Sequence, residues 1–172
     1  MKAGTGAWFG ALALAMLSVA PLRAAEPQPA DAVIIVAPSR APVSLGAAEL
    51  SALPSKQVAV SFATEQGTLT GSFEGPLLWS VLEKAGAIDP AKHRDQVSQT
   101  VVILARDGYR AVLALAEIAP EFEAKQVILA VRADGKPLGA GHPRLIVPLD
   151  KRGGRSVRDV VRIELVGLAD TK

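Results

Sequence analysis

The chain has 172 residues, enough for one domain with a single hydrophobic core. Its 19 Lys and Arg side chains against 17 Asp and Glu give a formal net charge of +2, far too small an excess for a nucleic-acid partner. The absence of cysteine excludes disulfides, a thiol nucleophile and thiolate metal ligands, and the two histidines, His93 and His142, have no ligand partner at helical spacing, which argues against a zinc site.

The N-terminus has the order of a secretory signal peptide. Lys2 precedes an apolar run over residues 7–20, and the small pair Ala24-Ala25 follows. The run is shorter than the roughly 20 residues that a membrane-spanning helix needs. Export with cleavage is therefore favoured, and a retained membrane anchor is the alternative. We expect residues 1–25 to be cleaved, residues 26–31 to form a flexible leader, and the protein to be periplasmic or secreted. Cleavage removes two cations and no acid, so 17 basic and 17 acidic side chains remain.

The first third of the mature chain predicts short strands around one helix. Residues 32–36 are a run of Val and Ile typical of a buried strand. Residues 45–53 predict a short helix with its leucines on one face. Residues 57–62 and 68–73 alternate apolar and polar side chains on either side of a glycine. These two segments therefore predict a hairpin.

Residues 76–85 predict the main amphipathic helix, with Pro76 at its first position and Gly86 as its left-handed stop. The expected buried stripe consists of Leu77, Leu78, Val81, Leu82 and Ala85. Trp79 is expected to pack against this stripe rather than to contact a cofactor. The polar residues 87–98 predict a connection in which His93 is exposed.

The second half predicts further strands and turns. Residues 100–105 and 109–115 flank Asp107-Gly108 and predict an antiparallel pair, and residues 117–122 predict a short helical piece. Residues 126–133 predict a buried strand that ends in a tight turn.

Two more strands are expected towards the C-terminus. Residues 144–149 form the first, in which Pro148 marks an edge, an end or a bulge. Ser156 is expected to cap a short turn of helix, and residues 161–166 to alternate with Val161, Ile163 and Leu165 on one face. With about eight strands and three short helices, residues 32–169 predict a mixed α+β single domain, β-rich and mostly antiparallel.

Residues 73–86, 106–109 and 129–165 form three blocks that, in chain order, resemble the sulfite-oxidase-type molybdopterin-binding family. FEGPLLWSVLEKAG at residues 73–86 is similar to the family's W-x-GVPL-x-x-LL-x-x-AG segment, and RDGY at residues 106–109 to its DGY step. LAVRADGKPLGAGHPRLIVPLDKRGGRSVRDVVRIEL resembles its NG-x-PL, P-x-R-L-V-V-P and RSVKW steps in order. The resemblance covers roughly residues 57–167 and implies the family's fold and molybdopterin as cofactor.

The same resemblance implies an anion-binding set. Arg144 occupies the arginine of the P-x-R-L-V-V-P step, displaced by one residue, and Arg158 stands at the lysine of RSVKW. His142, Arg155 and Tyr109 complete the candidate cofactor-binding residues. A guanidinium in place of the lysine still binds phosphate.

An alternative interpretation of the basic cluster remains open. In it, Lys151, Arg152 and Arg155 are a solvated turn, and Arg158 and Arg162 pair with Asp159 and Glu164. Tyr109 would then only pack locally with its hydroxyl hydrogen-bonded, and His142 would be a loop residue.

The family holds molybdenum through the pterin dithiolene and one cysteine, in the interval that corresponds here to residues 62–67. That interval is FATEQG and offers no sulfur. We therefore expect absent or altered molybdenum catalysis, and whether the protein is an enzyme stays open. One hypothesis is an exported cofactor-binding member with a membrane electron-transfer partner. The other is a cofactor-free scaffold that binds a small anion or a partner protein.

Overall fold

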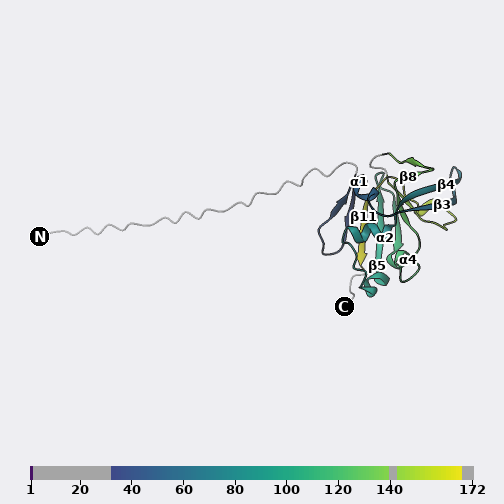
Figure 1. Cartoon of the computed structure of the whole chain (residues 1–172). Helices are drawn as coiled ribbons and strands as arrows, with labels where there is room; N and C mark the ends of the chain where they lie inside the picture. The colour runs from purple at the N-terminus through teal and green to yellow at the C-terminus, as the bar shows by residue number, and fades with distance from the viewer. Residues whose placement is uncertain (2–31, 140–142, 168–172) are drawn as a thin grey trace.

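The computed structural model describes Met1, residues 32–139 and residues 143–167. Its largest sheet has the strand order β2-β1-β11-β5-β6 (Figure 1). These strands are β1 (Val33–Val36), β2 (Val43–Leu45), β5 (Gln99–Ala105), β6 (Arg110–Ala114) and β11 (Val160–Gly167). Strand β1 runs parallel to β11, and the other neighbours in this sheet are antiparallel.

A second sheet has the order β3-β4-β8-β9, and a third consists of β10 and β7. The strands are β3 (Ser55–Thr64), β4 (Gly67–Pro76), β7 (Ile128–Ala130), β8 (Arg132–Ala133), β9 (Lys136–Pro137) and β10 (Arg144–Ile146). The β3–β4 hairpin extends to one side of the molecule (Figure 1). Four short helices, α1 (Ala47–Ser51), α2 (Leu78–Lys84), α3 (His93–Ser98) and α4 (Leu115–Ile118), and the 3₁₀ turn η1 (Gly153–Arg155) complete the described elements.

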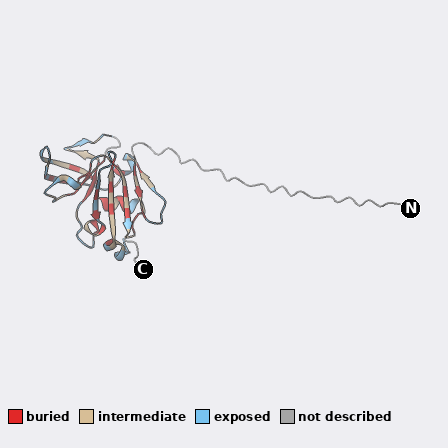
Figure 2. Ribbon diagram, turned by 180° about the vertical axis from the view of Figure 1, so that it is seen from behind, coloured by how far each residue is buried: buried red, intermediate tan, exposed pale blue. Residues whose placement is uncertain are grey.

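Buried side chains form two clusters, and Figure 2 shows burial concentrated on the central strands. The larger cluster joins the five-stranded sheet to α2, whose Leu78, Val81 and Leu82 are fully buried. The smaller cluster lies beneath the hairpin and consists of Val58, Val60, Phe62, Phe73, Ile128, Ala130 and Ile146. Within the described ranges, no helix is long and apolar enough to span a membrane.

The expected fold class is confirmed, as are the first strand, the hairpin and the antiparallel pair around Asp107-Gly108. The stripe of α2 is also confirmed at its centre, but the predicted start of this helix is wrong. Pro76 closes β4 by pairing with Ser55, and α2 begins at Leu78. Leu77 has an extended backbone and bridges to Ile128, so it packs on the smaller cluster.

Several predicted boundaries are corrected where tertiary contacts decide the local structure. Leu45 belongs to β2, which the sequence did not predict, and α1 starts after it. Residues 93–98 form α3, although they were expected to lack regular structure. Helix α4 starts at Leu115, two residues before the predicted piece. The predicted strand over residues 126–133 is divided between two sheets, as β7 and β8.

Two details near the C-terminus also differ from expectation. Strand β11 has an irregular register between Val160 and Arg162, which buries Val160 and leaves Val161 only partly buried beside the buried Ile163. Ser156 ends η1 instead of capping a following turn, and its Oγ accepts a hydrogen bond from the Val147 N–H at 3.2 Å. Pro148 lies just beyond β10, in agreement with the strand end that it predicted.

Candidate functional site

Arg144 begins β10 and lies over an aromatic ring. In the β10–β7 ladder it pairs with Ala130. Its guanidinium carbon is 5.2 Å from the ring centroid of Phe73, a buried residue of β4. This cation–π contact orients the guanidinium. Its Nε is buried and has no hydrogen-bond partner within the described part of the chain.

Arg158 adds a second positive charge to this place. The pKa of Arg144 is lowered first by burial and then by the charge of Arg158, so the two guanidinium groups are close enough to repel each other. Among residues 32–139 and 143–167, no carboxylate forms an ion pair with either arginine. The structure therefore brings two predicted site residues together with their charges uncompensated by ion pairs from those residues.

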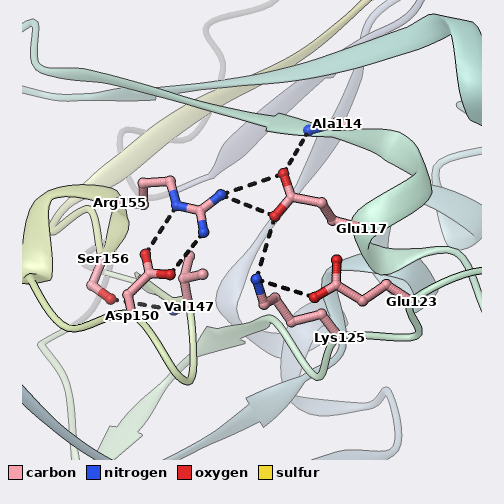
Figure 3. Close-up of polar contacts among 8 residues, drawn as sticks. All are labelled: Ala114, Glu117, Glu123, Lys125, Val147, Asp150, Arg155 and Ser156. Carbon is pink, nitrogen blue, oxygen red and sulfur yellow. Dashed lines mark hydrogen bonds and ion pairs between the residues drawn. The ribbon is translucent and has the colours of Figure 1, made fainter.

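Arg155 lies in a network of carboxylates (Figure 3). Its Nε and Nη2 donate to the two oxygens of Asp150 at 2.9 and 2.7 Å, and its Nη1 donates to Glu117 Oε2 at 2.9 Å. These hydrogen bonds, those that Arg155 donates to Asp150 foremost, raise the pKa of Arg155. The Lys125 Nζ lies 3.4 Å from Glu117 Oε2 and 3.4 Å from Glu123 Oε1. A cofactor role for Arg155 remains a prediction, and an anion there would compete with these carboxylates.

Glu117 is the centre of this network. Burial alone would raise its pKa, but the hydrogen bond from the Ala114 N–H, the hydrogen bond from Arg155 and the charges of Arg155 and Lys125 outweigh burial and lower the pKa. The carboxylate therefore stays ionised while it links α4 to the segment around η1. The sequence signal for this residue is its position three residues after Ala114, where its side chain accepts a hydrogen bond from the backbone before α4.

Tyr109 and the histidines occupy other places. The Tyr109 hydroxyl donates to the Gly154 carbonyl at 2.8 Å, and half of the residue is exposed. His142 lies outside the described residues. His93 pairs with Glu121 at the surface. Arg162 pairs with Glu164, as the solvated interpretation of the basic cluster expects. The cofactor roles of Tyr109 and His142 stay predictions.

The interval that would carry the metal-binding cysteine is the tip of the β3–β4 hairpin. Phe62 is buried, and Ala63 donates its N–H to the Lys151 carbonyl at 3.0 Å. Thr64 closes the turn by donating its hydroxyl to the Gly67 carbonyl at 2.8 Å. This tip presents hydroxyl, amide and carboxylate groups. Within the described residues there is also no group of three His, Cys, Asp or Glu side chains arranged to hold a metal.

Comparison with known proteins identifies the fold. The family model described as the oxidoreductase molybdopterin binding domain matches residues 33–170. The chain belongs to this family. None of the curated proteins that were searched matches the sequence.

A solved structure supports the same assignment. It is the sulfane dehydrogenase SoxCD from Paracoccus pantotrophus, with a TM-score of 0.62 and 16% sequence identity. The match covers 82% of this chain but 39% of that one, so this domain corresponds to less than half of the other polypeptide. The likeness establishes the sulfite-oxidase-type molybdopterin-binding fold and does not extend to the reaction of the larger protein.

The residues present fit one part of a molybdopterin cofactor and not another. Arg144 and Arg158 suit a phosphate group, because their charges are close together and the buried Nε–H of Arg144 has no acceptor among the described residues. The molybdenum itself does not fit in the family's manner, since the chain contains no cysteine. No reaction step through the metal follows from this donor set.

Proposed function

We propose that this domain binds the phosphate end of molybdopterin, or another small phosphate-bearing anion, through Arg144 and Arg158. The observation that carries the proposal is the Arg144 guanidinium, whose buried Nε has no hydrogen-bond partner among the described residues. Burial first, and then repulsion by the charge of Arg158, lower the pKa of Arg144. A dianionic phosphate would remove this repulsion and accept hydrogen bonds from both groups. Arg144 supplies the more rigid half, since Phe73 holds its guanidinium from one side.

We further propose that the domain does not catalyse sulfite-oxidase-type turnover. A thiolate donates electron density to molybdenum in a way that a hydroxyl or carboxylate does not reproduce. The hairpin tip around Thr64 offers only these harder ligands. Metal analysis and a sulfite-dependent assay on protein isolated from its own compartment test this proposal. Stoichiometric molybdenum together with turnover would overturn it.

The alternative function is a cofactor-free scaffold for a partner protein. It is favoured by the carboxylate network around Arg155, which satisfies one of the candidate cofactor residues within the chain. The two proposals differ in the role of Arg144 and Arg158. These arginines bind the anion in the first proposal, whereas a scaffold for a partner protein does not need them for a small anion.

Titration of the Arg144→Ala, Arg158→Ala double variant separates these functions. Loss of both guanidinium groups should weaken binding of molybdopterin and of inorganic pyrophosphate at least about tenfold, because each charged hydrogen bond contributes about 1.5 to 3 kcal/mol. The matched control is Arg94→Ala, Arg110→Ala, which removes the same charge from exposed positions. Calorimetry measures both affinities. Equal affinities for wild type and the double variant would exclude the anion site.

We also propose that the protein is exported and processed near residue 26, because Lys2, the apolar run and Ala24-Ala25 have the order of a signal peptide. The expected result is a mature chain that lacks about the first 25 residues. Intact-mass spectrometry of protein from the extracytoplasmic fraction measures this directly. Soluble extracytoplasmic protein that still begins at Met1 would contradict it.

A further inference from the structure

The loop of residues 148–152, called the 148–152 loop below, presents an unusual leucine. Leu149 is 91% exposed and has a φ of +68°. Bulky residues seldom adopt this left-handed conformation, because their Cβ approaches the following carbonyl oxygen. A leucine that is both strained and exposed contributes nothing to the packing of its own domain. Such backbone outliers concentrate at functional sites.

The 148–152 loop is held rigidly on both sides of this leucine. Before it, the buried Val147 donates its N–H to Ser156 Oγ at 3.2 Å. After it, Asp150 accepts two hydrogen bonds from Arg155, which is itself bound to Glu117 (Figure 3). The outward position of Leu149 is therefore fixed by the fold, and little conformational entropy is lost when the loop makes a contact.

The charge that the loop shows to the outside is positive. Its one acid, Asp150, is directed to Arg155 and has a side chain that is 16% exposed. Lys151 and Arg152 are exposed, and neither forms an ion pair with a described residue. A bridge between Arg152 and Ala63 fixes this end of the loop against the β3–β4 hairpin. The result is a projecting leucine followed, after the inward-directed Asp150, by two exposed cations that form no ion pair with a described residue.

We propose that the 148–152 loop docks on an anionic phospholipid bilayer, with Leu149 in the apolar boundary layer and Lys151 and Arg152 on lipid phosphates. Binding at the membrane interface scales with the apolar area buried in the boundary layer, to which Leu149 would contribute its exposed side chain. Adjacent cations add electrostatic attraction to an anionic leaflet. This surface contact uses none of the residues of the proposed anion site, Arg144 and Arg158, and does not depend on the proposed function.

The absence of cysteine permits a direct test on the full chain. A single Leu149→Cys substitution carries an environment-sensitive fluorophore at the loop, and Val97→Cys, at a residue 59% exposed on α3, serves as the reference position. Vesicles contain either phosphatidylcholine alone or phosphatidylcholine with about 30 mol% phosphatidylglycerol. The label at position 149 should brighten and shift to the blue only with the anionic vesicles, and the label at position 97 should not change. Comparing the two labels within the whole chain separates the loop from any contribution of the apolar N-terminal run.

A second arm removes the charges. In the chain labelled at position 149, Lys151→Gln with Arg152→Gln should raise the lipid concentration at half-saturation at least about tenfold, because each cation near the surface contributes to attraction. Thermal melts check that the variants are folded. No change at position 149, an equal change at position 97, or an equal response to neutral vesicles would overturn the proposal. No fluorescence change at position 149 would instead favour a partner protein with a pocket for Leu149.

Discussion

Gly75→Ala is expected to destabilise the fold by about 3 kcal/mol or more, enough to unfold much of a marginally stable domain. A Cβ at this position would lie 2.2 Å from the Leu129 carbonyl oxygen and 2.7 Å from the Ala130 Cα. These are backbone atoms of β7, so no side-chain rotation can relieve the overlap. Either β4 or β7 would have to move, at the expense of the buried contacts around both.

The matched control is Gly167→Ala in β11, where the new Cβ meets no heavy atom within 4 Å. This change should leave stability within about 0.5 kcal/mol of wild type, or raise it slightly by restricting the unfolded chain. Urea titrations followed by circular dichroism measure both variants. Equal midpoints for Gly75→Ala and Gly167→Ala would mean that β4 and β7 do not approach as closely as the structure shows.

The close approach at Gly75 also explains how the anion site is built. The end of strand β4 lies beside β7, where the Val131 N–H donates to the Glu74 carbonyl at 2.9 Å and the Leu78 N–H to the Val127 carbonyl at 2.8 Å. The same approach of β4 to β7, which pairs with β10, brings Phe73 against the guanidinium of Arg144. A structural glycine and a candidate ligand-binding residue therefore depend on one packing arrangement.

Elements with strong local patterns could be predicted from the sequence. In β3, Val58, Val60 and Phe62 alternate with exposed residues, and this period of two is visible without any tertiary information. Helix α3 could not be found in this way, because its single buried residue is the polar Gln96. The division of residues 126–133 between β7 and β8 depends on the Val131 hydrogen bond to Glu74, a contact between segments far apart in sequence.

The candidate site also contains residues that could be predicted from the sequence and residues that only the fold reveals. Arg144 and Arg158 were found because they match positions of a family motif, and the structure places their charges together. Phe73 was not predicted to belong to the candidate anion site, since 71 positions separate it from Arg144 in the sequence. Likewise, pairing of Arg155 with Glu117 joins residues 38 positions apart, and only the fold shows that this cation is already bound by acids.

The last prediction concerns this network. Glu117→Gln should lower the free energy of unfolding by about 1.5 to 3 kcal/mol near neutral pH, the usual contribution of hydrogen bonds to charged groups. The variant keeps an oxygen for the Ala114 N–H but leaves Arg155 and Lys125 without the carboxylate between them. Asp150 and Glu123 still contact these two cations, which keeps the expected loss moderate.

The pH dependence distinguishes this electrostatic role from simple packing. Because folding lowers the pKa of Glu117 from its ordinary value of 4.5, its contribution is complete above that value and is lost as the pH falls through the lower pKa of the folded state. The difference in unfolding free energy between wild type and Glu117→Gln should therefore shrink in acid. The control is Glu65→Gln at the exposed hairpin turn, which should change stability by less than about 0.5 kcal/mol near neutral pH. A difference for Glu117→Gln that stays constant from neutral pH into acid would show that the loss comes from packing and not from the charge.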